Sequence, residues 1–534
     1  MGERATQESM WSSNSRDVWL TLLTLMAVSI FINADRSLMS ILMESIKADF
    51  GISDAEVGFI FGTSISVFYA LFSIPLGRLA DVWNRKTLTA VGIGACGVMI
   101  AVTGAAKSFM ALAVCRIGVG IGESSAGPAA ISMVADLFPA RWRATAMSIM
   151  ASGANVGTGI GLFAGGYTLD AWNNAYPDSE SAPFGLKGWQ ASIMLLALFG
   201  VFLSWVVSSL KEPKRGASDG LDVPPYPHPF RDTWEVMKTI LPGFNLAALG
   251  RLNGVRGVFI NLLLALGLTF LVLVLSKLTE SAAQWVALLF GVYCVASWIQ
   301  AISFRDTAMY TMIFKSRTLV LIFVGAAFFF FVNAGVLTWI APLLQRVYSV
   351  SASQAGLSIG LCSVAGGLIG TVLGGVIADR LRGLSQVSGF YVMMGSIVLT
   401  GLALMFLLEA SSYGLAILGF ALYVLFSSLW FGVVLSLVSE LLVPRMRATA
   451  TAFYLISITF TGFALGPYTV GLLSDLFQFS GSDAGEALSS ALKITLVALP
   501  FGLVLIFLAS RNFARESSSV VERARALGEE VNKA

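Results

Sequence analysis

The chain has 534 residues, of which 56% are hydrophobic and 12% are charged, and its net charge is +3. Soluble proteins carry about 25% charged residues, and the mean hydropathy of +0.79 reflects more apolar sequence than one soluble core can bury. The composition excludes a nucleic-acid-binding protein and a disordered scaffold. It indicates a polytopic membrane protein with the lipid bilayer as its surroundings.

Apolar stretches of about 20 residues predict fourteen spanning helices. The first six lie near 17–43, 55–77, 87–106, 109–136, 143–168 and 187–209. A polar linker and an amphipathic stretch at 233–252, which we expect on the membrane surface, precede two further spans near 255–275 and 281–303. The last six lie near 317–345, 353–377, 386–408, 411–438, 446–471 and 489–510.

An even number of spans places both termini on one side of the membrane. Most of the 34 Lys and Arg residues fall on that side, and the positive-inside rule identifies it as the cytoplasm. We expect a bacterial inner-membrane protein. Its predicted parts are a cytoplasmic tail (1–16), a six-helix bundle (17–210), a cytoplasmic linker (211–254), two inserted helices (255–303), a second six-helix bundle (304–510) and a cytoplasmic tail (511–534).

The two bundles repeat one another in sequence. DLFPARWRATAMSI at 136–149 matches ELLVPRMRATATAF at 440–453, and GRLAD at 77–81 matches GVIAD at 375–379. The match continues into the following span with the pairs Gly157/Gly462, Gly161/Gly466, Gly166/Gly471 and Asp170/Asp475. Parallel six-span repeats are typical of transporters that rock two bundles around a central site.

The repeated loops resemble the signature of the major facilitator superfamily, at 77–86 (GRLADVWNRK) and 374–383 (GGVIADRLRG). The resemblance implies the major-facilitator fold, here all-α with two inserted spans. It also implies that charged side chains of these loops close a cytoplasmic gate. Val82 and Asn84 depart from the usual Arg and Gly of the signature. The predicted gate residues are Gly77, Asp81, Arg85, Lys86, Arg141, Arg143, Asp379, Arg380, Arg445 and Arg447.

Within that superfamily the chain resembles the Spinster group. INADRSL at 32–38 resembles the N-x-x-D-R element of that group, and 116–139 resembles its R-x-x-x-G-x-G-E run with a D-L-F-P end. The family core has twelve spans, so the two inserted spans lie outside the resemblance.

Four ionisable residues lie deep within predicted spans: Asp35, Arg36, Arg116 and Glu123. An intramembrane charge costs about 2.5–3.5 kcal/mol on insertion scales and indicates function. Seven residues, or two helical turns, separate Arg116 from Glu123, so both project from one face of their helix. Because arginine keeps its proton, Asp35 and Glu123 are the candidate proton carriers and the arginines are their electrostatic partners. A static cluster that fixes the first and fourth spans together is the alternative.

Polar and aromatic residues within other spans are candidates for lining a substrate cavity: Asn33, Tyr69, Ser124, Ser125, Asn155, Asn333, Trp339, Tyr423, Trp430 and Tyr454. A cavity that is charged on one wall and apolar on the other suits an amphiphile. Spinster relatives are associated with lysolipids and sphingolipid-type molecules, so the resemblance implies a lipid-like substrate. A hydrophilic organic anion and a drug-type efflux substrate are the alternatives.

Residues for catalysis or metal binding are sparse. The lone histidine, His228, lies in the polar sequence PPYPHPF, and the four cysteines fall in apolar runs without CxxC spacing. We expect no enzyme activity, no metal, and no cofactor other than a proton gradient. We also expect a monomer.

Overall fold

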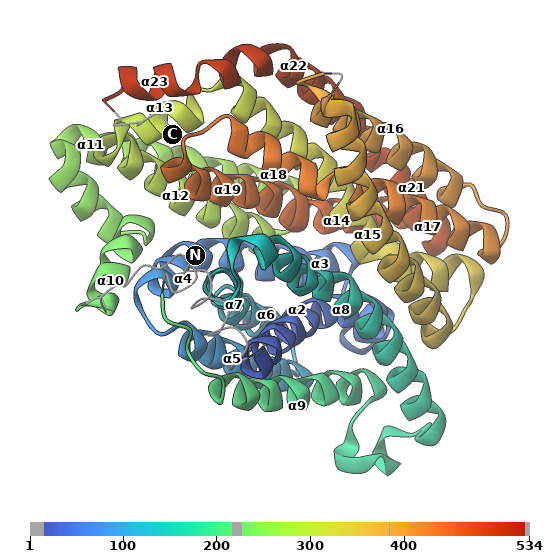
Figure 1. Cartoon of the computed structure of the whole chain (residues 1–534). Helices are drawn as coiled ribbons and strands as arrows, with labels where there is room; N and C mark the ends of the chain where they lie inside the picture. The colour runs from blue at the N-terminus through green and yellow to red at the C-terminus, as the bar shows by residue number, and fades with distance from the viewer. Residues whose placement is uncertain (1–14, 216–226, 384, 529–534) are drawn as a thin grey trace.

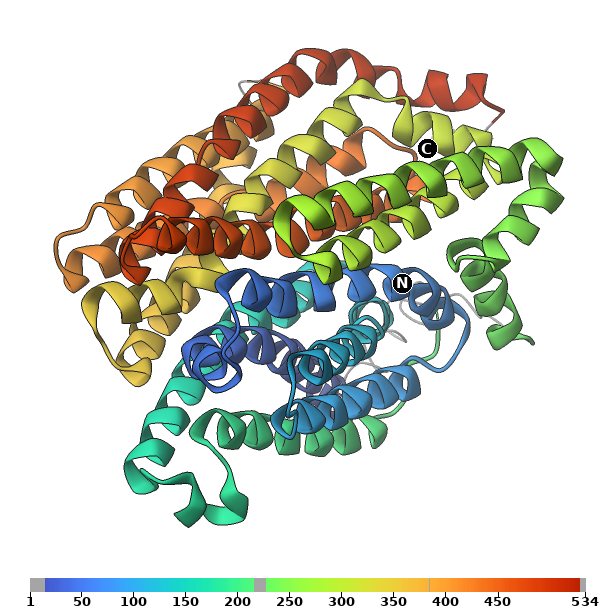
Figure 2. The same cartoon turned by 180° about the vertical axis from the view of Figure 1, so that it is seen from behind.

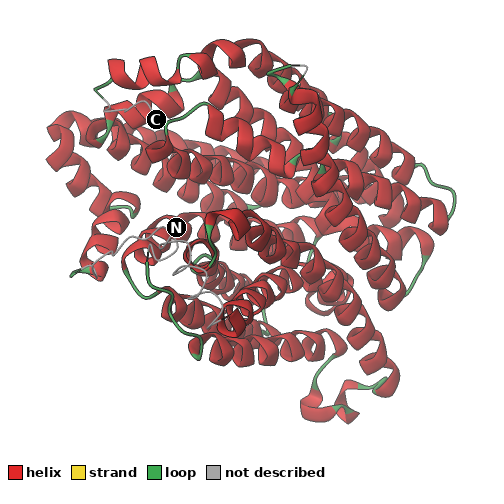
Figure 3. Ribbon diagram, in the orientation of Figure 1, coloured by secondary structure: helices red, strands yellow, loops and turns green. Residues whose placement is uncertain are grey.

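The computed structural model describes residues 15–215, 227–383 and 385–528. The regular structure within these ranges is helical, without strands (Figure 3). Fourteen helices are long and apolar enough to cross a membrane, which confirms the all-α class and the predicted number of spans. Most of the predicted tail 1–16 and part of the linker, 216–226, lie outside the described residues.

The N-terminal half builds six spans, of which the second and the fourth each contain more than one helical element. Its helices are α2 (Ser15–Phe50), α3 (Asp54–Gly58), η1 (Phe59–Thr63), α4 (Ser64–Val82), α5 (Arg85–Gly104), α6 (Phe109–Glu123), α7 (Ala126–Leu137), α8 (Ala140–Ala175) and α9 (Gly188–Ser208). Two short 3-10 helices, η2 (Ser179–Ser181) and η3 (Pro183–Gly185), lie in the loop before α9.

The C-terminal half repeats this plan. Its helices are α14 (Arg317–Tyr348), α15 (Ala352–Arg382), α16 (Ser388–Leu408), α17 (Tyr413–Ser428), α18 (Phe431–Glu440), α19 (Pro444–Ile458), η5 (Thr459–Leu465), α20 (Gly466–Phe479), α21 (Ala484–Thr495) and α22 (Ala498–Ser518). A short helix, α23 (Val520–Ala526), follows the last span.

The linker and the insert form α10 (Pro229–Ile240), α11 (Phe244–Thr279) and α12 (Ala282–Arg305), and the short helix α13 (Thr307–Phe314) follows the insert. The predicted amphipathic stretch 233–252 is divided between α10 and the first turns of α11, because Pro242 and Gly243 interrupt the helix. Non-helical dihedrals at Asn253 and Gly254 then separate those turns from the spanning part of α11.

The two halves lie side by side, the N-terminal half in blue to teal and the C-terminal half in yellow to red (Figure 1). The repeated G-x-x-A-D motifs, at the ends of α4 and α15, belong to the end that carries α10, α13 and α23, toward the upper left of Figure 1. We call this the motif end and the opposite end the far end. Figure 2 shows α11 and α12, in green, crossing the face that Figure 1 hides.

The inserted hairpin contacts both halves through α12. Its Phe290 stacks on Phe68 of α4, and its Trp298 stacks on Phe453 of α19 with a centroid distance of 4.7 Å. A buried hydrogen bond of 2.6 Å also joins Thr63 of η1 to Gln284 of α12. The insert is therefore packed across the joint between the halves on one side of the molecule.

A buried polar cluster holds α11 against α12. Asn261 bonds to Tyr293, Ser297, Gln300 and Asn245 at 2.6 to 3.3 Å. We expect Asn261→Ala to destabilise the protein by about 1–3 kcal/mol, because it leaves several buried polar groups without partners. Thermal unfolding in detergent measures the effect.

Thr269→Val is the matched control for Asn261→Ala, since the exposed Thr269 hydroxyl bonds only to the Ala265 carbonyl of its own helix. Equal melting temperatures for the two variants would contradict a stabilising role of the cluster.

Candidate functional site

The four predicted intramembrane charges come from α2 and α6, with Arg116 in the middle of α6 and Glu123 at its end. Helix α6 ends at Glu123, and α7 begins at Ala126 after a short break in the span. The matching span of the C-terminal half is broken at the corresponding place, between Ser428 and Phe431. Helix α2 packs closely on α8 as well. A Cβ at Gly161 of α8 would lie 2.4 Å from the carbonyl oxygen of Ala34 in α2. This close approach fixes the depth of Asp35 and Arg36.

Asp35 and Arg116 form a two-pronged ion pair. The Arg116 Nη1 and Nη2 atoms donate to Asp35 Oδ1 and Oδ2 at 3.1 and 2.6 Å. Both side chains are almost completely buried. A parallel pair of charge-assisted bonds fixes the orientation of both groups, so this pair joins α2 rigidly to α6.

Arg36 and Glu123 form the second ion pair, and this pair reaches the interior cavity. Arg36 donates from Nη2 and Nε to Glu123 Oε2 at 2.6 and 3.1 Å. Glu123 is 1% exposed, whereas Arg36 is 31% exposed. The Arg36 guanidinium also lies over the Tyr69 ring, 5.1 Å from its centroid. Arg36 is thus the charged side chain of the cluster that a molecule in the cavity can touch.

Glu123 has an unused acceptor. Its Oε1 atom is buried and has no hydrogen-bond partner among the described residues, and the same holds for Arg116 Nε. Two carboxylates and two guanidiniums give the cluster no net charge when all four are ionised. A proton that binds Glu123 therefore leaves an arginine without a counter-charge, and a change at one pair affects the other.

A cavity of about 190 Å³ lies between the halves beside Arg36. The N-terminal half lines it with polar groups such as Asn33, Ser37 and Thr158, and the C-terminal half contributes mainly Leu337, Ile340, Ile359 and Phe463. Ser40 also bonds to the Thr338 carbonyl oxygen of the other half at 2.7 Å. One wall is polar and carries a cation, and the other is largely apolar.

Of the predicted cavity residues, the structure places Asn33 in this lining and Tyr69 beneath Arg36. The others lie in packed positions. Ser124 and Ser125 bond to carbonyls of their own helix turn, and Asn155 lies against Gly367 of α15. In the C-terminal half, five predicted residues are buried and bond to protein groups instead of lining the cavity: Asn333, Trp339, Tyr423, Trp430 and Tyr454.

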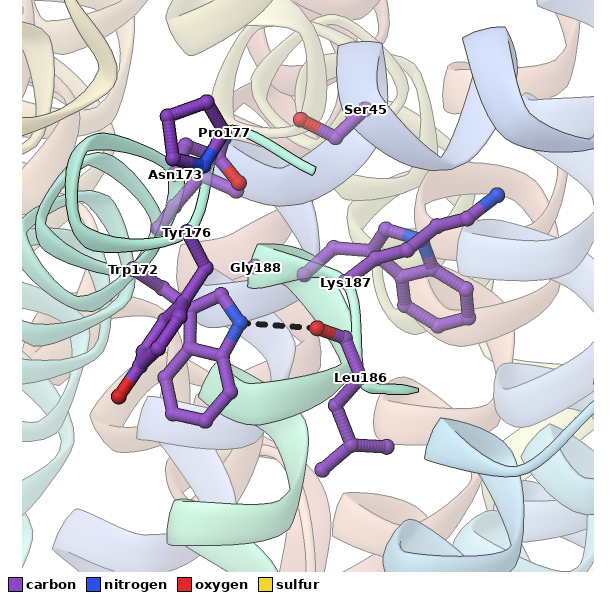
Figure 4. Close-up of a pocket in the computed structure, with 10 residues that line it drawn as sticks. Ser45, Trp172, Asn173, Tyr176, Pro177, Leu186, Lys187 and Gly188 are labelled. Carbon is purple, nitrogen blue, oxygen red and sulfur yellow. Dashed lines mark hydrogen bonds between the residues drawn. The ribbon is translucent and has the colours of Figure 1, made fainter. Parts of the chain in front are cut away.

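A second pocket, of about 280 Å³, lies at the far end between α2, α8 and α9. It is lined by aromatic rings, including Trp172, Tyr176 and Trp189, and Figure 4 shows the hydrogen bond from Trp172 to Leu186 at its edge. Trp172 donates to the Leu186 carbonyl at 2.8 Å, and Trp189 donates to Asp49 at 2.9 Å. These bonds hold the loop before α9 against α8 and α2.

The predicted gate residues at the motif end bind mainly within their own half. Arg85 is fully buried and pairs with Asp136 and Glu212, at 2.9 Å for Glu212. Lys86 donates to the Ser208 and Leu210 carbonyls.

The paired aspartates of the motif end are exposed. In the part of the chain that the structure describes, neither Asp81 nor Asp379 has an ion-pair partner in the opposite half. Gly77 lies beside Pro128 of α7.

The remaining gate residues belong to the second copy and to the loop before α8. Arg445 pairs with Asp306 at 2.9 Å, and Arg447 donates to the Ser439 and Leu442 carbonyls. Arg143 donates to the Phe138 carbonyl, and Arg380 is exposed. The Arg141 side chain lies outside the described part of the chain. The inter-half latch at the motif end therefore stays a prediction for another conformation.

At the far end, by contrast, ion pairs do cross between the halves. Arg346 of α14 binds Glu44 of α2 at 2.7 Å and Asp54 of α3 at 2.8 Å. Asp54 is fully buried and also bonds to Ser474 and Gln478 of α20. Sequence reasoning missed this cluster, because Arg346 and Asp54 lie at span ends, where charges are ordinary. The far end is closed in this structure.

The arrangement is that of a membrane transporter with two similar halves around a charged central cavity. A family model, Major Facilitator Superfamily, matches residues 25–467. The chain belongs to this superfamily, as its repeated loops predicted.

Relatives and solved structures agree with the predicted resemblance to the Spinster group. The sphingosine-1-phosphate transporter of Danio rerio is 24% identical over 90% of this chain and 81% of its own length. An MFS-type efflux pump of Mycolicibacterium smegmatis is 23% identical over 96% of both chains. The crystal structure of a bacterial homolog to the human lysosomal transporter Spinster, inward-facing and unoccupied, matches with a TM-score of 0.70 at 20% identity. It covers 94% of this chain and 98% of that one.

Proposed function

We propose that the chain is a proton-coupled secondary transporter of an amphiphilic organic substrate with an anionic head group. The observation that carries the proposal is the Arg36–Glu123 pair at the edge of the cavity. The two halves would open the cavity alternately to the two sides of the membrane. Both termini, and with them the motif end, would lie in the cytoplasm, since most of the Lys and Arg residues lie on that side.

Competition for Arg36 would couple substrate to protons. Arg36 offers its exposed edge to the cavity while it donates two hydrogen bonds to Glu123 that favour the ionised carboxylate. An anionic head group that binds Arg36 would weaken its hold on Glu123, and a carboxyl group in an apolar setting then favours the protonated form. The Oε1 atom of Glu123 supports this, because it is a buried acceptor without a hydrogen-bond partner among the described residues and would take the proton. Asp35 would be a second carrier, and its proton would require movement of Arg116.

The two walls of the cavity support an amphiphile as substrate. Hydroxyl groups and Arg36 face an anionic head, while Leu337, Ile340 and Phe463 face an apolar body. Sphingosine-1-phosphate, for which the Danio rerio relative is named, has this chemistry. The relative named as an efflux pump favours a drug-type substrate as the second candidate.

A thermal-shift measurement in lipid nanodiscs tests the substrate class. We expect lysophosphatidylglycerol to stabilise the protein more than sphingosine or glucuronate does, because it combines an anionic head with an apolar chain. A ligand at about 100 times its Kd stabilises the native state by about 2.7 kcal/mol. The stabilisation is expected to disappear in Arg36→Gln.

Arg251→Gln is the matched control for Arg36→Gln, since Arg251 is an exposed cation outside the cavity, and it should keep the full shift. Stabilisation by glucuronate alone would replace the amphiphile with a hydrophilic organic acid. An equal shift in Arg36→Gln and wild type would remove Arg36 from the site.

A further inference from the structure

The two halves meet at the far end along two seams, one between α8 and α15 and one between α20 and α3. In each seam, a carboxylate of one half accepts hydrogen bonds from the backbone of the other. Asp170 in α8 accepts a hydrogen bond from the Ser353 N–H at the start of α15, at 2.8 Å. Asp475 in α20 accepts from the N–H groups of Asp54 and Ala55 at the start of the second span, at 2.9 and 2.7 Å. All three bonds cross the boundary between the halves.

The two contacts are copies of one another. Asp170 and Asp475 are partners in the sequence repeat. Gly166 and Gly471, one turn before them, are also partners, and each lies against the backbone of the same opposing helix. A Cβ on Gly166 would lie 2.3 Å from the Ala352 carbonyl oxygen, and one on Gly471 would lie 2.2 Å from that of Asp54. Both seams therefore have backbone-to-backbone contact beside the aspartate.

The helices α3 and α15 each begin with a serine cap that leaves the first backbone N–H groups free to bind the opposite half. The side chain of Ser53 accepts from the Glu56 N–H, and that of Ser351 accepts from the Gln354 N–H, at 3.2 Å in both cases. These local caps occupy the third amide of each helix, while the earlier amides have no acceptor within their own helix. A carboxylate at that place gains charge-assisted bonds and a favourable interaction with the helix dipole.

We propose that Asp170 and Asp475 are gating residues that form two equivalent latches between the halves and hold the far end closed. A rocking motion that opens the far end must break both latches together, because the repeat relates them. The Arg346 ion pairs join the halves at one seam only. The aspartate-to-amide contact, by contrast, occurs in both seams. The inference is independent of the substrate and of the coupling ion.

A distance measurement between the halves tests the latches without a substrate. Spin labels are attached at Asn174→Cys and Ser411→Cys, two exposed far-end positions of opposite halves, after the four native cysteines are replaced by alanine. Pulsed electron resonance then gives the distance distribution in nanodiscs. We expect Asp170→Ala/Asp475→Ala to add a longer-distance population and to raise the open-to-closed ratio at least about tenfold, because the lost bonds are charge-assisted.

Asp483→Ala is the matched control, because Asp483 caps α21 within its own half through the Gly485 N–H. It should keep the distribution of the labelled parent. Each single variant should also shift the distribution, by less than the double variant does, so a double variant that does not fold leaves the test intact. Distributions of the single and double variants equal to that of the parent would overturn the proposal.

Discussion

Glu123→Gln is expected to reduce pH-driven substrate accumulation in proteoliposomes at least about tenfold, while substrate exchange at equal pH continues. Glutamine keeps the size of glutamate and an oxygen that accepts from Arg36, but it has no titratable proton. A cycle that requires a proton on Glu123 then loses its driving force. Exchange only requires the loaded carrier to reorient, so it continues without net proton movement.

The matched control for Glu123→Gln is Glu235→Gln, an exposed carboxylate of α10 that pairs only with Lys238 in the next turn. It should leave both kinds of flux unchanged. Accumulation by Glu123→Gln at the wild-type rate would exclude Glu123 as a proton carrier. Loss of exchange together with accumulation would indicate a structural role for Glu123.

Arg116→Gln is expected to destabilise the protein by about 3–5 kcal/mol, because it leaves the Asp35 carboxylate buried without its cation. Thermal unfolding of the purified protein measures this effect. Asp35→Asn should be destabilising for the same reason, since it leaves a buried guanidinium. The double variant Asp35→Asn/Arg116→Gln removes both charges and should recover most of the loss.

The double variant also decides between the two interpretations of this pair. If the pair only fixes α2 to α6, the double variant keeps pH-driven flux. If Asp35 carries a proton, flux falls although stability returns. Melting temperatures of both single variants equal to that of wild type would contradict the assigned ion pair.

The spans and the positions of the intramembrane charges could be predicted because each depends on a local run of sequence. Apolar stretches define the spans, and a charge within such a stretch is conspicuous. The repeat between 136–149 and 440–453 supplied the two-bundle plan without any structural knowledge. The predicted number of spans was confirmed for this reason.

The pairing of the four charges could not be predicted, because it depends on contacts between helices. Asp35 and Arg36 are neighbours in the chain, but successive residues of a helix point about 100° apart. They consequently bind two different residues of α6, Arg116 and Glu123, which lie two turns apart. Side-chain exposure cannot be read from sequence either, so Arg36 and Arg116 could not be distinguished as the cation that reaches the cavity.

Residue type alone did not predict which residues line the cavity. Trp339, Tyr423 and Trp430 have polar atoms within spans, as a binding residue would, yet their polar atoms bind protein groups in the core. An aromatic ring with one polar atom suits both roles equally well. The cavity lining found here also contains small hydroxyl residues, such as Ser37 and Thr158, that no sequence pattern singled out.

Two helix starts at the closed far end have a recognisable sequence pattern. SDAE at 53–56 and SASQ at 351–354 each begin a helix with a serine followed three residues later by Glu or Gln, the pattern of a capping box. Together with the Asp170/Asp475 repeat, this pattern marks two helix starts and two carboxylates in equivalent places. Their meeting across the halves required the structure.

Substrate-dependent proton movement tests the central claim most directly. Proteoliposomes that contain a pH-sensitive dye receive lysophosphatidylglycerol on one side, with no other gradient imposed. The account predicts a pH change inside the liposomes that requires the protein and the amphiphile and is absent in Glu123→Gln. Transport of the amphiphile without any change in internal pH would contradict proton coupling.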